Sequence, residues 1–241
     1  MDLQIIYEDN DVLVVDKPAG IVVFPEGQTT QKTLIDYLIE QYPELKSVGE
    51  APRYGVVHRL DKDTSGILLA AKSTKALIFL QKQFKNREVG KKYIALGTGV
   101  IENEKGVIHT LIGRSKSDPR KQTAHSLEYK GKTGLREAIS EYKVLERFKE
   151  YTLLEVQIKT GRKHQIRTHL AYIHHPIAGD TVYGFKDSPT PEGLTRQFLH
   201  ACYVKITLPN GQIKEFHSDV PEELQKILNN LEKYVNHNRT I

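Results

Sequence analysis

The chain opens with two short apolar runs on either side of an acidic turn, a pattern typical of a β-hairpin. Residues 5–18, IIYEDNDVLVVDKP, carry it, and Pro18 ends the second strand because its nitrogen cannot donate to a ladder. Residues 91–100 (KKYIALGTGV) and 106–113 (GVIHTLIG) predict further strands.

Two longer segments also predict hairpins. Residues 137–161 alternate over two runs and are expected to bend near Phe148 to Glu150. Residues 204–218 contain Asn210-Gly211, a dipeptide that accepts the positive φ angles of a tight turn.

Three segments carry apolar residues at the three- and four-residue spacing of a helix. The first, Thr33 to Tyr42, stops at Pro43. The second begins at Ser73 or Thr74, either of which can cap it. The third covers residues 221–235, with proline in its first turn. Their expected buried faces comprise Leu34, Ile35, Leu38, Ile39 and Tyr42; Leu77, Leu80 and Phe84; and Leu224, Ile227, Leu228 and Leu231.

Strands in hairpins outnumber helices and do not alternate with them, which indicates an α+β fold. We expect a mainly antiparallel mixed sheet flanked by helices and loops. No internal repeat, low-complexity segment or linker interrupts the sequence, so residues 1–241 are predicted to form a single domain.

Composition is that of a soluble globular protein, with 27% charged and 8% aromatic residues. The formal net charge of +5 helps a protein to meet polyanions, although many basic proteins have no nucleic-acid partner. The single cysteine, Cys202, excludes an internal disulfide and indicates a reducing compartment. Without a leader or an apolar run that could span a bilayer, a cytoplasmic protein with no membrane partner is expected.

The segment HRLDKDTSG, His58 to Gly66, gathers charges of both signs between apolar runs. The Thr-Ser-Gly sequence at the end of this segment predicts a turn, and Asp63 is expected to cap that turn with its side-chain oxygen. Asp61 ends the expected apolar strand Tyr54 to Leu60, where a carboxylate is partly desolvated unless a cation faces it. Asp61 is therefore the better candidate for chemistry.

That cation can come from GRKHQIRTHL, Gly161 to Leu170. Gly161 is expected to precede a helix whose apolar stripe is Ile166, Leu170 and Ile173. Arg167 adjoins this stripe and is the candidate to reach inward. The basic side chains expected over the rest of the helix are Arg162, Lys163, His164 and His169.

No metal-binding pattern links the histidines His58, His164, His169, His174 and His175. On a helix of 3.6 residues per turn, His164 and His169 are roughly 140° apart, which does not make a ligand face. No Cys or Glu pattern of a zinc site accompanies them, so no metal is expected.

Two other segments allow two interpretations each. Tyr93 lies in a predicted strand and either fills the core or stacks on a base. Residues 113–132, GRSKSDPRKQTAHSLEYKGK, are the most basic part of the chain and predict an exposed loop with a short strand inside it. Composition alone favours a solvated insertion, and contact with RNA is the alternative.

Six motifs follow one another along the chain: DKPAG (16–20), HRLDKDTSGILLAAK (58–72), KKYIALG (91–97), TGRKHQIRTHL (160–170), HPIAGDTVYG (175–184) and LHA (199–201). In this order they resemble the RluA-type family of pseudouridine synthases, which isomerise uridine in RNA. The resemblance covers nearly the whole chain and implies that family's fold, with a central active-site cleft and no cofactor. Many members carry a small RNA-binding domain before the first motif, so this chain is expected to be the catalytic domain alone.

The resemblance implies roles for individual residues. Asp61 fills the acidic position of the HRLD motif as the catalytic aspartate, and Arg167 is its paired cation. Tyr93 packs on the target uracil and is a candidate base. Arg59 helps to fill the space that the flipped uridine vacates. Further expected RNA contacts are His58, Leu170, Arg114, Lys116, Arg120 and Lys121.

Several alternatives stay open at this point. The expected partner is ribosomal or transfer RNA, and a monomer is the default. Asp61 either bonds to C1′ of the ribose or removes a proton from C2′ to give a glycal. An N-glycosidase and an inactive RNA-binding module are the rival functions. One departure from the family is Ser140, where threonine is usual.

Overall fold

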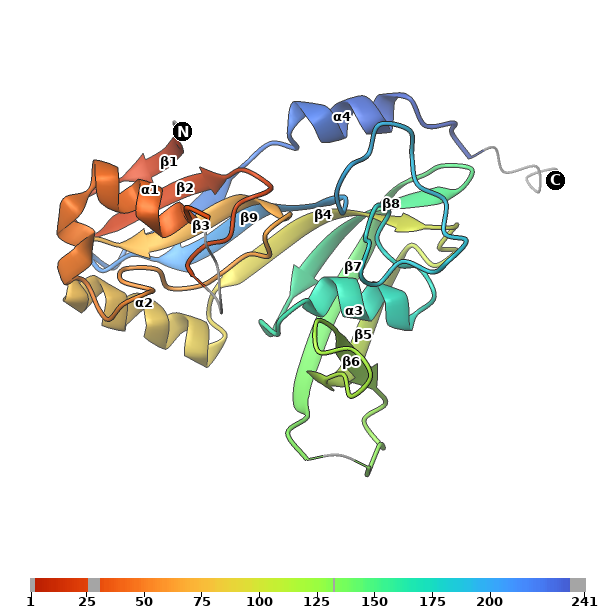
Figure 1. Ribbon diagram of the computed structural model, residues 1–241, viewed down its shortest axis with the longest axis horizontal. Helices are drawn as coiled ribbons and strands as arrows, with labels where there is room; N and C mark the ends of the chain where they lie inside the picture. The colour runs from red at the N-terminus through yellow and green to blue at the C-terminus, as the bar shows by residue number, and fades with distance from the viewer. Residues whose placement is uncertain (1–2, 26–30, 132, 235–241) are drawn as a thin grey trace. The chain divides into compact units, whose positions relative to one another are not determined.

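The computed structural model describes residues 3–25, 31–131 and 133–234. Two compact units make up the chain (Figure 1): Met1–Lys91 with His200–Asp219, and Lys92–Leu199 with Val220–Ile241. The expectation that residues 1–241 act as one catalytic domain spans both units and stays a prediction.

The first unit contains a mixed sheet in the order β1-β2-β3-β9-β10. Its strands are β1 (Gln4–Glu8), β2 (Val12–Lys17), β3 (Ser65–Ala71), β9 (Leu199–Thr207) and β10 (Ile213–His217). Neighbouring strands are antiparallel except β3 and β9, which pair in parallel through Ser65 and Gly66. The predicted β9–β10 hairpin is confirmed, and Gly211 takes φ +85° in its turn.

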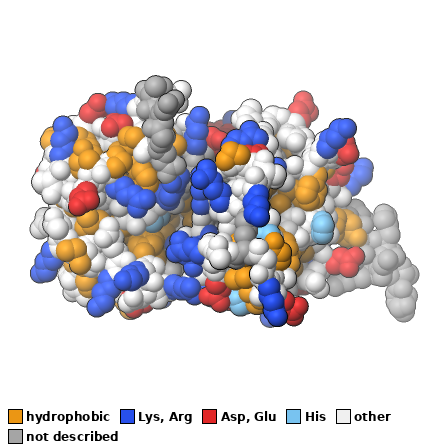
Figure 2. Space-filling view, turned by 60° about the horizontal axis from the view of Figure 1, so that its bottom comes forward, with side chains coloured by type: hydrophobic (Ala, Val, Ile, Leu, Met, Phe, Trp, Pro, Cys, Tyr) orange, Lys and Arg blue, Asp and Glu red, His pale blue; other side chains and the backbone are white. Residues whose placement is uncertain are grey.

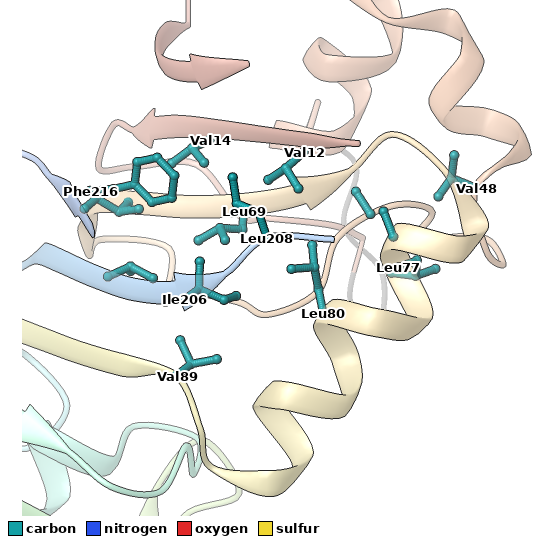
Figure 3. Packing of buried hydrophobic residues seen from close by; sticks show 14 residues of the cluster. Val12, Val14, Val48, Leu69, Leu77, Leu80, Val89, Ile206, Leu208 and Phe216 are labelled. Atoms are coloured by element: carbon teal, nitrogen blue, oxygen red, sulfur yellow. The ribbon is translucent and has the colours of Figure 1, made fainter. Parts of the chain in front are cut away.

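Two helices of the first unit begin at or next to the predicted residues, and the third, a 3-10 helix, was not predicted. They are α1 (Leu34–Gln41), the 3-10 helix η1 (Pro43–Ser47) and α2 (Thr74–Asn86). Ser73 caps α2, because its Oγ accepts a bond from the N–H of Ala76 at 3.1 Å. Figure 3 shows apolar side chains of α2 packed with those of β2, β3, β9 and β10. The sequence pattern therefore specified both the helix and its buried face.

The expected strand from Tyr54 to Leu60 is wrong. In this segment only Val56 forms a bridge, to Ala70, and the rest consists of turns and irregular backbone. Tyr54 has a φ of 47°, which a strand does not allow. The segment is apolar because it lies against β3, where Gly55 accepts a bond from the N–H of Ala71 at 2.7 Å.

The second unit contains an antiparallel sheet in the order β4-β8-β7-β5-β6. Its strands are β4 (Gly90–Thr98), β5 (Lys105–Arg114), β6 (Gln122–His125), β7 (Arg136–Arg147) and β8 (Tyr151–Ile158). The β7–β8 hairpin turns between Arg147 and Tyr151, as predicted, and β6 is the short strand expected inside the basic segment. An α+β fold with a mainly antiparallel mixed sheet is thus confirmed.

The helices of the second unit, α3 (Gln165–Tyr172) and α4 (Glu222–Asn229), are shorter than expected. Because His164 takes φ 55°, α3 starts at Gln165, and Arg162, Lys163 and His164 precede it. The chain leaves α4 after Asn229 and bridges to Phe148 through Lys233. Leu231 consequently lies beyond the helix, and residue 235 falls outside the described residues.

Candidate active site

Asp61 lies in the loop that leads into β3. The N–H of Thr64 donates to the Asp61 carbonyl at 3.1 Å, which closes a turn. Asp61 is half-buried, and Thr64 and Ser65 after it are buried. The sequence thus places the carboxylate on a tight turn at the start of a fully buried strand.

A buried lysine fastens this loop to the DKPAG segment. Lys17 is 0% exposed, and its ammonium donates to the carbonyls of Pro18 (2.8 Å), Ile21 (2.9 Å) and Lys62 (2.9 Å). Burying an ammonium is costly unless its N–H groups find acceptors, and here three carbonyls meet three N–H groups. Because the Lys62 carbonyl also accepts from the N–H of Gly20 at 3.0 Å, the residue next to Asp61 is held twice.

Arg59 provides positive charge close to Asp61 within the same unit. Burial lowers the pKa of the Arg59 guanidinium, and the Asp61 carboxylate partly opposes that shift. The guanidinium also lies 5.5 Å from the centre of the Phe24 ring. Arg59 therefore remains charged and contributes to the field at Asp61.

His58 is fixed as a neutral ring. Its Nε2 accepts the backbone N–H of Leu69 at 3.1 Å, and its ring stacks on Phe84 with centres 4.8 Å apart. Burial, and then the charge of Lys91, lower the pKa of His58 to about 3. Since protonation at Nε2 would break the bond to Leu69, His58 serves this loop as an acceptor.

A hydrogen-bonded chain joins three of the sequence motifs. His200 donates from Nε2 to the Ser218 carbonyl at 3.0 Å, which leaves Nδ1 to accept from Ser65 Oγ at 3.0 Å. The Ser218 hydroxyl donates to Asp16 at 2.7 Å. These bonds connect DKPAG, the start of β3 and LHA, three segments that are far apart in the sequence.

In the second unit, Tyr93 and Arg167 are both buried. Tyr93 lies on β4 opposite Val156 of β8 and is 8% exposed. Arg167 lies on α3 and is 5% exposed. The expected pairing of Arg167 with Asp61 joins residues of different units and stays a prediction.

Asp180 holds the guanidinium of Arg167. Arg167 Nε donates to one carboxylate oxygen at 2.7 Å and Nη2 to the other at 2.9 Å. Burial opposes ionisation of Asp180, but Arg167 and the N–H groups of Tyr183 and Val182 hold its pKa below the ordinary value. The planar fork fixes the direction of Nη1, whose N–H bonds point away from Asp180.

Helix α3 is anchored to the sheet by buried polar side chains. Gln165 donates to Ile139 O and Ser140 Oγ, both at 3.0 Å. His169 is 0% exposed and lies between the hydroxyls of Ser140 (2.8 Å) and Thr110 (2.9 Å). His169, which was expected only to lie outside the apolar stripe of the helix, is buried, and these hydroxyls give both ring nitrogens a partner inside the unit.

Tyr183 connects Arg167 with the basic segment. Its ring centre lies 5.1 Å from the Arg167 guanidinium carbon. Its hydroxyl accepts the N–H of Gln122 at 2.7 Å and lies 3.0 Å from His164 Nδ1. Burial raises the pKa of Tyr183. One side chain thus touches the start of β6, the residue before α3 and the buried arginine.

A family model described as RNA pseudouridylate synthase matches residues 11–172. The chain belongs to this family. An uncharacterized RNA pseudouridine synthase, YlyB of Bacillus subtilis, is 41% identical over 97% of this chain and 74% of its own length. Ribosomal large subunit pseudouridine synthase D of Vibrio cholerae is 37% identical over 100% of this chain and 74% of its own length.

Solved structures agree with the sequence relatives. Human RNA pseudouridylate synthase domain containing 1 has a TM-score of 0.77 at 27% identity, over 97% of this chain and 89% of that one. Human RNA pseudouridylate synthase domain containing 4 has a TM-score of 0.74 at 25% identity, over 95% of this chain and 94% of that one. This pseudouridine synthase is an isomerase that acts on RNA, as the sequence predicted.

The basic residues expected to contact RNA differ in how they are held. Arg114, Lys116 and Arg120 are exposed, and Arg120 already binds Asp118 through Nε (3.0 Å) and Nη2 (2.7 Å). The Lys121 ammonium lies 6.0 Å from the ring of Tyr183. On the face shown in Figure 2, Lys and Arg side chains are more prominent than acidic ones.

Leu170, the other expected contact of this pseudouridine synthase, is 1% exposed, and its carbonyl accepts from the N–H of His175 at 2.9 Å. Within the described ranges, no three His, Cys, Asp or Glu side chains gather as a metal site requires. Over the same residues, no helix has the length and apolar character needed to cross a bilayer.

Sequence reasoning missed Lys17, Asp180 and Tyr183 as site residues of the synthase. All three lie in motifs that carried the resemblance, DKPAG and HPIAGDTVYG, and that was the available signal. Their hydrogen-bond partners are distant in the sequence or meet them only in the folded structure, so the spacing of residues along the chain could not identify these three as site residues.

Proposed function

We propose that this pseudouridine synthase isomerises specific uridines of large-subunit ribosomal RNA, with Asp61 as its catalytic carboxylate. The observation that carries the proposal is the half-buried position of Asp61 on a turn that Lys17 anchors by a hydrogen bond to the Lys62 carbonyl. The RNA class is supported by relatives named for the large ribosomal subunit.

The reaction breaks the N-glycosidic bond of uridine, turns the base and joins it again through C5. The proton lost from C5 balances the one gained at N1, so neither an oxidant nor water is consumed. Cleavage builds positive charge at C1′, which an ionised carboxylate can stabilise or bond, as in glycoside hydrolysis. In the other route the same carboxylate removes a proton from C2′ to give a glycal.

Asp61 has to stay ionised in a site that excludes water, because water would intercept the intermediate. A carboxylate buried without a cation gains a proton instead. Arg59 supplies nearby charge, and we assign the same task to Arg167, whose guanidinium Asp180 holds in one orientation.

The target base also has to leave its stack, at a cost of a few kcal/mol. Tyr93 is proposed to stack on the flipped uracil, and Arg59 to fill the vacated space. Arg114, Lys116, Arg120 and Lys121 are proposed to hold phosphates of the RNA backbone.

The test is conversion of unmodified large-subunit ribosomal RNA by the wild type, Asp61→Asn and, as control, the exposed Asp187→Asn. Asp61→Asn is expected to lower the rate by roughly 10⁴-fold or more, as the loss of a catalytic group does, while RNA binding is retained. Pseudouridine is measured by its chemical labelling and unchanged mass.

Turnover by Asp61→Asn would contradict the assigned role of Asp61. Release of free uracil by the wild type would indicate an N-glycosidase. Pseudouridine formed in transfer RNA but not in ribosomal RNA would overturn the substrate and leave the chemistry standing.

A further inference from the structure

Lys91 and Lys92, at the start of β4, have opposite surroundings. Successive side chains of a strand point to opposite faces, so the two ammonium groups separate. Lys92 binds Glu155 of β8 at 3.1 Å. Lys91 is half-buried, and its ammonium lies 5.3 Å from the centre of the Phe84 ring on α2.

Lys91 has no acidic partner in the part of the chain that the structure describes. Burial alone lowers the pKa of its ammonium, to about 8, with no carboxylate to oppose the shift. An ammonium that loses water without gaining a counter-charge is unfavourable, and one aromatic ring offsets only part of that cost. The position is therefore one that a bound anion would stabilise.

This ammonium lies beside the loop that carries Asp61. The Phe84 ring that contacts Lys91 also stacks on His58, three residues before Asp61. The charge of Lys91 contributes to keeping His58 neutral. A neutral His58 does not compete for an anion, so Lys91 supplies the positive charge at this end of the loop.

We propose that the Lys91 ammonium binds a phosphate of the RNA backbone adjacent to the target uridine. The enzyme acts on RNA, and a phosphate is the anion that RNA offers along its whole length. A charge-assisted bond formed in a partly dry position is stronger than one on the open surface. Adjacency to the target rests on the proposed role of Asp61.

The test compares Lys91→Met with its matched control Lys92→Met. Equilibrium binding to unmodified large-subunit ribosomal RNA is measured over a series of salt concentrations. Lys91→Met is expected to weaken binding about tenfold. Its slope of log K against log salt should be shallower by about 0.7, the value for one phosphate of a single strand. Lys92→Met should match the wild type, and Lys91→Arg, which keeps the charge, should retain most of the affinity.

Wild-type affinity and an unchanged salt slope in Lys91→Met would overturn the proposal. Thermal unfolding controls for the fold, and Lys91→Met is expected to melt at or above the wild-type temperature because a desolvated cation has been removed. If Lys91→Met does not fold, Lys91→Gln carries the same comparison. Activity of Asp61→Asn, or a wild type that modifies only transfer RNA, would count against the proposed function, and the Lys91 comparison is then made with the RNA that is modified.

Discussion

At the residue scale, this enzyme gives two of its buried charges a full set of specific partners. The Lys17 ammonium meets three carbonyls, and the Arg167 guanidinium meets both oxygens of Asp180. Such groups stabilise loops and helices and also restrict their orientation, because each hydrogen bond requires a particular angle between donor and acceptor. The backbone around Asp61 is held in this way.

Asp180→Asn tests how far Arg167 depends on its carboxylate. The variant leaves a buried guanidinium without its counter-charge, which typically costs about 3–5 kcal/mol of the free energy of unfolding. We also expect a large loss of isomerisation rate, because the guanidinium of Arg167 is no longer held in the one orientation that we propose serves Asp61. Urea unfolding and single-turnover kinetics measure the two effects.

A variant that keeps both stability and rate would show that Asp180 does not hold Arg167 in solution. The exposed Asp187→Asn is the control for the loss of one carboxylate from the same part of the chain. It should change neither quantity.

At the element scale, most helices and hairpins followed from the sequence, and the pairing of strands far apart along the chain did not. The cap at Ser73 and the turn at Asn210-Gly211 are local signals, because the deciding bond lies within a few residues. The parallel pairing of β3 with β9 joins residues more than 130 positions apart. No periodicity within a window of the chain specifies such a pairing.

The candidate site divides in the same way. Motifs pointed to Asp61, Tyr93 and Arg167, but the apolar run before Asp61 was mistaken for a strand. A segment that packs against a strand can have the composition of a strand, and the backbone separates the two here, through the φ of Tyr54 and the single bridge at Val56. The sequence could not predict the burial of His169 because its hydroxyl partners, on β5 and β7, are 59 and 29 residues away.

The burial of His169 makes the attachment of α3 sensitive to acid. Burial, and then the charge of His109, lower the pKa of His169 to about 4, against about 6.5 in an unfolded chain. Between these values the unfolded state binds the extra proton. The stability contributed by neutral His169 is therefore complete above pH of about 6.5 and is lost as the pH falls towards about 4.

His169→Asn should remove part of this pH dependence. The slope of the unfolding free energy with pH, at most about 1.4 kcal/mol per pH unit for one group, should decrease between about pH 4 and 6.5. The control is His174→Asn, an exposed position with φ 66° that asparagine accepts. Equal slopes in the wild type and His169→Asn, from urea unfolding over this range, would exclude His169 as the source.

At the scale of the whole molecule, the net charge does not show which lysines and arginines are available to bind RNA. The chain has 35 Lys and Arg residues against 30 Asp and Glu, and many of the cations bind carboxylates of the same chain. A cation that already has a carboxylate partner has to share or leave it before it can neutralise a phosphate. Affinity for RNA should therefore follow the partners of each residue more closely than the sum of charges.

The loop between β5 and β6 allows this to be measured on two residues that sequence alone treats as equivalent. Lys116 is exposed, whereas Arg120 is clamped by Asp118, whose pKa is lowered to about 2 by the hydrogen bonds from Arg120. Lys116→Ala should make the slope of log K against log salt shallower by about 0.7, and Arg120→Ala should change it much less. Asp118→Ala releases the guanidinium and should tighten binding. A larger effect of Arg120→Ala than of Lys116→Ala would mean that RNA displaces Asp118, and that pairing within the chain does not decide which cations bind.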